Sequence, residues 1–202
     1  MTEVGVPRER LVRWVENFST RHGGAELSVR DGHLCGVAVD GSTFAARQPF
    51  DTTYAGPAEP GAFAAAVGPP QTWGILLVRK GGFAIARLSH DRVEEHKIGQ
   101  RHVQGRTKAG GQSQQRFARR RDNQARQAYE AAAEHAVRIL GARSLQVVTG
   151  GDHAAIDEVL SDPRLSRLSV AGPWLAVPDP RRAVLDAAVA DALAVRVDVV
   201  NT

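Results

Sequence analysis

The sequence predicts an α/β fold, because segments with strand character alternate with amphipathic helices along most of its 202 residues. The clearest strand is the apolar run 73–78, which is typical of a strand buried on both faces of a sheet. The clearest helix is 113–140, which contains neither Pro nor Gly. Four prolines in 56–70 mark a domain boundary before the strand 73–78. We therefore expect a small α+β region over residues 1–70 and a larger α/β domain over residues 71–202.

The N-terminal region is expected to hold one helix and several short strands. Apolar residues at helical spacing over 7–21 predict an amphipathic helix, which the pair Gly23-Gly24 ends. Residues 25–48 then read as short strands, because Asp31-Gly32 and Asp40-Gly41 are dipeptides that favour hairpin turns.

The larger domain is expected to alternate strands and helices. The segments 83–88 and 93–98 follow the first strand as a meander, and 99–112 reads as a polar, glycine-containing loop. Beyond the long helix, the strand 145–148 leads into a further helix with Asp152 as its N-cap. The remaining expected elements are that helix near 153–160, a short strand at 174–178, a helix over 181–194 and a closing strand over 195–200.

Positive charge is concentrated in one stretch of the chain. The formal net charge is +4, yet residues 101–126 hold eight Lys and Arg residues against one Asp, so the remainder is slightly acidic. A local basic patch favours an anionic partner such as a nucleic acid. Cys35 is the only cysteine, which excludes an intramolecular disulfide and a cysteine-rich zinc site. We find no signal peptide and no apolar run of membrane-spanning length, so we expect a cytoplasmic protein without membrane contact.

Gly110, Gly111 and Gln112 form the most informative motif, directly before the long helix. Glycine lets the backbone adopt positive φ and approach another molecule closely. The Gln112 amide donates and accepts hydrogen bonds but does not titrate. A neutral tip next to a cationic helix suits chemistry at the end of a nucleic acid.

Basic residues lie on both sides of this motif. Arg116, Arg119 and Arg120 share one side of the predicted helix through their i, i+3 and i+4 spacing. Arg106 and Lys108 precede the glycines. We expect these five cations to hold phosphates of RNA, which predicts binding that weakens steeply with salt. The plain alternative is a cationic helix face that contacts only solvent.

The segment 105–124 resembles the centre of the catalytic domain of eukaryotic and archaeal class I translation release factors. In those proteins a Gly-Gly-Gln-Ser loop precedes a helix that starts Gln-Arg-Phe-Ala-Arg; here the loop is 110–113 and the helix start is 115–119. The resemblance extends over residues 72–202 and implies a ribonuclease-H-like α/β fold, with a mixed sheet, flanking helices and an inserted catalytic loop. No codon-reading domain fits into residues 1–70, so the chain is most similar to a compact bacterial member of the Vms-like release-factor family.

The resemblance implies a peptidyl-tRNA hydrolase that releases nascent chains from stalled ribosomes or large subunits without recognising a stop codon. It assigns the catalytic role to Gly110, Gly111 and Gln112, and it adds Ser113 to the residues that contact RNA. The implied partners are peptidyl-tRNA and the rRNA of the peptidyl-transferase centre in the large subunit. We expect the protein to act as a monomer, with no cofactor and no catalytic metal.

Two other functions stay open at the level of sequence. A nuclease that cuts the CCA end of tRNA would fit the ribonuclease-H-like resemblance, although Asp40, Asp91 and Asp152 are too scattered for a convincing metal site. A non-catalytic module that binds the ribosome or RNA would fit the charge alone. Analysis of the tRNA product distinguishes the peptidyl-tRNA hydrolase from the nuclease. Measurement of turnover distinguishes both enzymes from the non-catalytic binding module.

Overall fold

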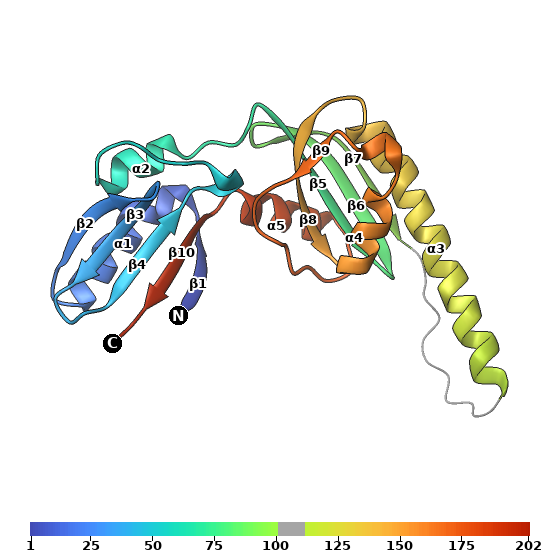
Figure 1. Ribbon diagram of the computed structural model, residues 1–202, viewed down its shortest axis with the longest axis horizontal. Helices are drawn as coiled ribbons and strands as arrows, with labels where there is room; N and C mark the ends of the chain where they lie inside the picture. The colour runs from blue at the N-terminus through green and yellow to red at the C-terminus, as the bar shows by residue number, and fades with distance from the viewer. Residues whose placement is uncertain (101–111) are drawn as a thin grey trace. The chain divides into compact units, whose positions relative to one another are not determined.

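The structure is a computed structural model that describes residues 1–100 and 112–202, with the backbone alone described over 112–125. Two five-stranded sheets and five α-helices lie within the described residues (Figure 1), which confirms the predicted mixed α/β class. None of these helices is both long enough and apolar enough to cross a membrane. The chain forms two compact units, the first made of residues 1–70 and 189–202 and the second of residues 71–188.

The sheet of the first unit is entirely antiparallel. Its strand order is β1-β10-β4-β3-β2. The strands are β1 (Thr2–Val6), β2 (Ala25–Arg30), β3 (His33–Ala38), β4 (Thr43–Arg47) and β10 (Val195–Val200). Asp31 and Gly32 both have positive φ, 49° and 77°, as a two-residue hairpin turn between β2 and β3 requires. The hairpins expected over 25–48 are therefore present.

Two helices cover one face of this sheet. A 3₁₀ turn at Arg8–Arg10 leads into α1 (Leu11–Arg21), and α2 (Pro60–Ala66) packs beside it. Their apolar side chains meet the inward-facing residues of the strands in one core. Fully or almost fully buried members are Leu11, Val15, Phe18, Leu34, Phe44, Phe63, Val195 and Val197.

The C-terminal strand departs from the expected domain boundary. Residues 195–200 were expected to close the 71–202 domain, but β10 lies between β1 and β4 in the first sheet. The sequence of β10 explains this placement. Val195 and Val197 face the core, whereas Arg196 and Asp198 are only half-buried, an alternation that suits a sheet with one open face. A strand covered on both faces would read as a continuous apolar run, as 73–78 does.

The second sheet is mixed. Its order is β7-β6-β5-β8-β9, in which β5, β6 and β7 form an antiparallel meander while β8 and β9 run parallel to β5. The strands are β5 (Thr72–Arg79), β6 (Gly82–Ser89), β7 (Arg92–Gln100), β8 (Leu145–Gly151) and β9 (Leu168–Val170). The helices α3 (Gln112–Leu140) and α4 (His153–Leu160) belong to this unit, with a 3₁₀ turn at Pro163–Leu165, and α5 (Arg182–Ala192) spans the boundary between the two units.

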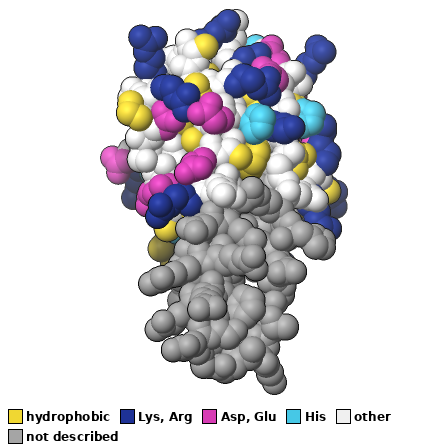
Figure 2. Space-filling model, turned by 90° about the vertical axis from the view of Figure 1, so that its right-hand side faces the viewer, with side chains coloured by type: hydrophobic (Ala, Val, Ile, Leu, Met, Phe, Trp, Pro, Cys, Tyr) yellow, Lys and Arg dark blue, Asp and Glu magenta, His cyan; other side chains and the backbone are white. Residues whose placement is uncertain are grey.

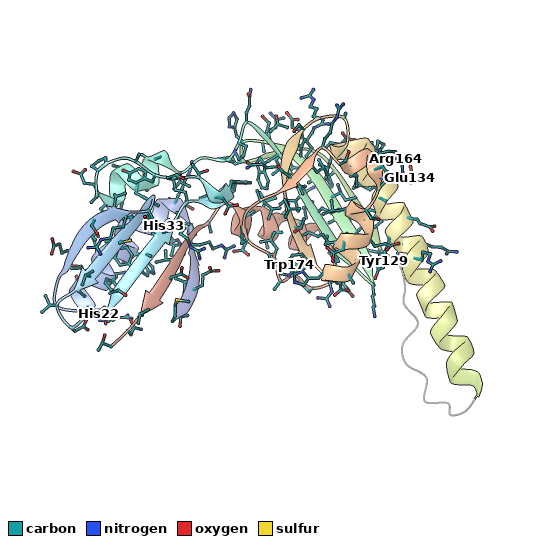
Figure 3. The ribbon with its side chains drawn as sticks, in the orientation of Figure 1. His22, His33, Tyr129, Glu134, Arg164 and Trp174 are labelled. Atoms are coloured by element: carbon teal, nitrogen blue, oxygen red, sulfur yellow. The ribbon has the colours of Figure 1, made fainter. Side chains whose placement is uncertain are left out.

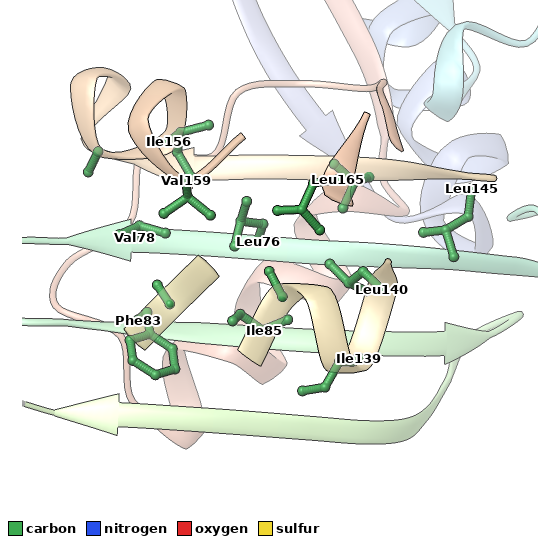
Figure 4. Packing of buried hydrophobic residues seen from close by; sticks show 14 residues of the cluster. Leu76, Val78, Phe83, Ile85, Ile139, Leu140, Leu145, Ile156, Val159 and Leu165 are labelled. Atoms are coloured by element: carbon green, nitrogen blue, oxygen red, sulfur yellow. The ribbon is translucent and has the colours of Figure 1, made fainter. Parts of the chain in front are cut away.

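α3 and α4 pack on one face of this sheet through a closely filled core (Figure 4). β5 contributes Leu76 and Val78, and Ile139 and Leu140 come from the end of α3. The other face of the central strands is buried as well, since Trp73, Ile75 and Leu77 have no exposed surface. The continuous apolar run of β5 thus correctly predicts a strand covered on both sides.

The short strand expected at 174–178 does not form as such. Only Leu175 makes an isolated bridge, to Gly150 of β8, and the ladder on that side is made by β9 instead. Pro173 precedes the segment and Pro178 is its last residue, and proline has no N–H to donate to a ladder.

Candidate functional site

The residues predicted to act on the substrate lie at the junction of β7 and α3. Gly110, Gly111, Arg106 and Lys108 fall outside the described residues. Gln112 is the first residue of α3, which is 29 residues long. Ser113, Arg116, Arg119 and Arg120 follow within its first three turns, and their side chains lie outside the description.

β7 ends at the edge of the sheet where the parallel strands β5 and β8 also end. In register, Gln100 of β7 pairs with Gly82, and Gly82 pairs with Arg79 at the end of β5. Val78 pairs with Gly151 at the end of β8. β7 runs parallel to β5 because both are antiparallel to β6. The candidate site thus starts from the carboxyl edge of the sheet, where open α/β sheets place their ligands.

The second half of α3 fixes the helix to the sheet. Ala128, Ala132, Ala136, Ile139 and Leu140 are buried and recur at the spacing of one helix face. Small side chains at three of these positions let the helix backbone lie close to β5 and β6. Between 113 and 127 only three residues are apolar, so that half has no comparable stripe. Figure 1 shows it extending beyond the sheet.

One ion-pair group holds α3 to the segment after α4. Arg164 contacts Glu134 of α3 at 2.7 Å and Asp162 at 2.6 Å (Figure 3). Asp162 also accepts a hydrogen bond from the Arg164 backbone N–H at 2.9 Å. The side-chain and backbone hydrogen bonds from Arg164 lower the pKa of Asp162 to about 2, and the same partners raise the pKa of Arg164. Arg164 and Glu134 are solvent-exposed and Asp162 is half-buried, so we expect this ion-pair group to affect geometry more than stability.

A second group holds the end of α3 to the meander. Arg138 of α3 contacts Glu95 of β7 at 2.6 Å, and Arg87 of β6 contacts the same carboxylate at 3.5 Å. Arg87 also donates a hydrogen bond of 3.4 Å to the carbonyl of Ile139 in the last turn of α3, where helix carbonyls lack intrahelical partners. Figure 2 shows cationic, acidic and histidine side chains intermixed on this face.

His135 lies near the same group, between α3 and the meander. Its ring centroid is 5.6 Å from that of Phe83. Partial burial, followed by the charges of Lys97 and Arg138, lowers the pKa of His135. The imidazole is therefore held in its neutral form more firmly than a free histidine.

A hollow of about 570 Å³ opens at the carboxyl ends of β5 and β8, and we call it the edge hollow. It is lined by Arg79, Lys80, Tyr129, Gly151, Asp152, His153, Ala154, Ala155 and Asp179. Tyr129 and Trp174, which lies beside the hollow against His153, are labelled in Figure 3. Sequence reasoning missed this site because its side chains come from four separate segments. The Gly150-Gly151-Asp152 turn was the one local signal.

Asp152 precedes α4 as expected, but its side chain does not cap the helix. One carboxylate oxygen instead accepts a hydrogen bond of 3.3 Å from the Lys80 backbone N–H, and the other is 3.8 Å from the Arg79 guanidinium. Asp152 therefore ties the β5–β6 turn to the start of α4. Asp152 thus occupies the predicted N-cap position, where its backbone carbonyl accepts from the N–H groups of Ala155 and Ile156, but its carboxylate bonds the neighbouring strand end and makes no capping hydrogen bond.

The acidic residues that were weighed as metal ligands are distributed over both units. Asp40 belongs to the first unit and bonds His22 at 2.7 Å, whereas Asp152 lies in the second unit. Over the part of the chain that the structure describes, no three His, Cys, Asp or Glu side chains are placed to hold a metal ion. Cys35 is half-buried on β3 of the first unit.

Comparison with known protein families identifies this fold. The model of the Actinobacteria/chloroflexi VLRF1 release factor family matches residues 71–198, which is more than half of the chain. The matched range holds the whole second sheet, the junction of β7 with α3, and most of β10. A comparison with curated proteins gives no match. The family implies a release factor that interacts with the ribosome. The chain belongs to the Actinobacteria/chloroflexi VLRF1 release factor family.

Proposed function

We propose that this protein is a peptidyl-tRNA hydrolase that releases nascent chains from stalled ribosomes or large subunits, without reading a stop codon. One observation carries the proposal: Gly110, Gly111 and Gln112 lie inside the range matched by the release-factor family, where β7 gives way to α3. The partners would be peptidyl-tRNA and the rRNA of the peptidyl-transferase centre. The protein would act in the cytoplasm as a monomer.

The reaction is hydrolysis of the ester between the peptide and the terminal ribose of tRNA. Gly110 and Gly111 would make a narrow tip that approaches the CCA end closely. The backbone N–H of Gln112 would stabilise the developing oxyanion, and its side-chain amide would place the attacking water. Removal of one such donor typically lowers a rate about 10²–10³-fold. Glutamine does not act as a general base, so the ribose hydroxyl would carry the proton.

The fold supports separate roles for the motif, which would act on the ester, and for α3, which would position it. The second half of α3 is packed on the sheet and held by Arg164 and Arg138, so the helix presents its first residue at a defined distance from the core. Seventeen residues of helix separate Gln112 from Tyr129, which corresponds to about 25 Å. Such a projection suits a reaction centre that lies deep within RNA. The cations on the first half of α3 would bind the surrounding phosphates.

Release of a labelled peptide from purified stalled complexes tests the proposal. We expect turnover by the wild type, and a rate lowered at least a hundredfold by Gln112→Ala with ribosome binding unchanged. Gln127→Ala is the matched control on the same helix, and it should leave the rate within about twofold because it lies beyond the first turns. Equal release by Gln112→Ala and wild type would remove this residue from the mechanism.

The tRNA product distinguishes the alternatives in the same experiment. An intact CCA end on the released tRNA supports ester hydrolysis, and a shortened 3′ end supports a nuclease. Ribosome binding without any turnover would leave a non-catalytic binding module. Either of the last two outcomes would overturn the proposal.

A further inference from the structure

The edge hollow lies outside the catalytic motif but on the same edge of the sheet. β5 and β8 end at the hollow, and β7, the strand that precedes residues 101–111 in the sequence, ends at the same edge of the sheet. Tyr129 of α3 forms part of its wall. An RNA strand that reaches the first turns of α3 can therefore follow the helix to this hollow, about 25 Å away. The volume, about 570 Å³, falls within the usual range for small-molecule sites.

The hollow is lined by two cations and two carboxylates, and Lys80 is the one of these four groups that forms no ion pair within the described residues. The Arg79 guanidinium donates to the carbonyl of Val177 at 2.7 Å and is 3.6 Å from Asp179 and 3.8 Å from Asp152. The two carboxylates thus offset Arg79 and hold it in place. Lys80 is exposed, and its ammonium group forms none of the ion pairs found among the described residues. The formal charge of these four groups sums to zero, so the ammonium group of Lys80 is the charged group available for one phosphate.

An exposed aromatic platform forms part of the hollow. The rings of His153 and Trp174 are stacked, with centroids 3.6 Å apart and planes inclined by 11°. Trp174 packs against the core of the second unit, whereas His153 is exposed. One face of the imidazole is covered by the indole, which leaves its other face open. Bases of single-stranded RNA stack on such platforms irrespective of sequence.

A hydroxyl and a carboxylate complete the lining. Tyr129 is half-buried, and its burial together with the charges of Asp152 and Glu158 raises the pKa of its phenol. The hydroxyl therefore stays protonated and is available as a donor. Asp152 provides an acceptor on the same wall. A donor and an acceptor together match a ribose 2′-hydroxyl, the group by which proteins distinguish RNA from DNA.

We propose that the edge hollow binds one nucleotide of an RNA strand, with the phosphate at Lys80, the ribose at Tyr129 and Asp152, and the base on the open face of His153. This inference takes its class of ligand from the proposed function. It adds a second RNA contact, remote from Gln112, that would fix the orientation of the protein before hydrolysis.

Binding of a fluorescent single-stranded RNA of about eight nucleotides to the full chain, followed by anisotropy, tests this site. We expect Lys80→Ala to weaken binding and to lower the salt slope by about 0.7 between about 50 and 200 mM salt, as loss of one phosphate contact requires. Lys97→Ala on β7 removes the same charge elsewhere in the second unit and should leave affinity and slope within error of the wild type. Equal behaviour of the two variants would overturn the proposal.

The base and ribose contacts have their own tests. His153→Ala should weaken binding about tenfold, whereas His153→Phe keeps an aromatic platform and should retain most of the affinity. The wild type should prefer RNA to DNA of the same sequence, and Tyr129→Phe should reduce that preference. Equal losses in both His153 variants, or no preference for RNA, would overturn the proposal. None of these measurements needs hydrolysis, so absence of peptide release alone would count against the proposed function and not against this site.

Discussion

Ala136→Leu tests whether the packing of α3 against the sheet controls the rate of peptide release. Ala136 has no exposed surface and lies in the buried stripe that faces β5 and β6. Leucine adds three carbon atoms where no space exists, and overpacking of this kind typically costs about 1–3 kcal/mol. The helix is expected to lift from the sheet in response, because the strands beneath it are buried on both faces.

Because α3 is long, a small movement at Ala136 would displace Gln112 by a larger distance. Twenty-four residues separate Ala136 from Gln112, which corresponds to about 36 Å of helix. A rise of about 1 Å at Ala136, with the helix pivoting one turn away at Leu140, would tilt it by roughly 10° and move its first residue by several ångströms. Misplacement of a reacting group by about 1 Å can lower a rate about 10²-fold. We therefore expect peptide release to fall at least a hundredfold.

The assay is single-turnover peptide release, accompanied by thermal unfolding and ribosome co-sedimentation. Ala131→Leu makes the same chemical change at an exposed position of α3 and is the matched control. It should leave stability within about 0.5 kcal/mol and release unchanged. The reasoning is refuted if Ala136→Leu folds, binds ribosomes and releases peptide at the rate of Ala131→Leu.

Three further predictions concern the core, the pH response and the basic helix. Leu76→Ala should lower the free energy of unfolding by about 2–5 kcal/mol in denaturant titrations, because Leu76 is fully buried. Val170→Ala, at a position that is 58% exposed, should change it by less than about 0.5 kcal/mol. Similar losses in the two variants would contradict the burial of Leu76 in the core. Folding lowers the pKa of His135, so below about pH 6.5 the unfolded chain binds more protons than the folded chain and stability is lost as the pH falls. Between about pH 7.5 and 5.5 the melting temperature should therefore fall less in His135→Gln than in the wild type. Parallel curves for the two proteins would refute this prediction. Joint replacement of Arg116 and Arg120 by Glu should weaken ribosome binding and flatten its salt dependence in co-sedimentation, and an unchanged slope would show that these residues contact only solvent.

Local patterns in the sequence predicted the elements of the fold well. The Asp31-Gly32 turn has the positive φ angles of a tight hairpin, the apolar run of β5 is buried on both faces, and the stretch without Pro or Gly forms α3. Each of these outcomes depends on residues that are close in sequence. Local propensity and periodicity are sufficient for such elements.

Long-range pairing was beyond the reach of these patterns. β1 is short and holds Gly5, and its partner β10 lies almost 200 residues away, so neither strand indicates the other. The alternation in β10 does predict an open face, but not which sheet provides it. The edge hollow was missed for the same reason, because Lys80, Tyr129 and His153 meet only after folding.

The motif itself was found in the sequence, since Gly110, Gly111 and Gln112 are consecutive. What the structure adds is that Gln112 is the first residue of a helix whose far half is packed into the core. The first residue of such a helix is positioned by residues more than twenty positions away. The sequence alone does not reveal that dependence.

The most direct test of the account is the single-turnover rate of ester hydrolysis on peptidyl-tRNA bound to the large subunit, measured for wild type and Gln112→Ala at saturating protein. We expect both proteins to occupy the subunit, only the wild type to free the peptide rapidly, and the tRNA to keep its CCA end. Rapid peptide release by the occupied Gln112→Ala complex would contradict this expectation.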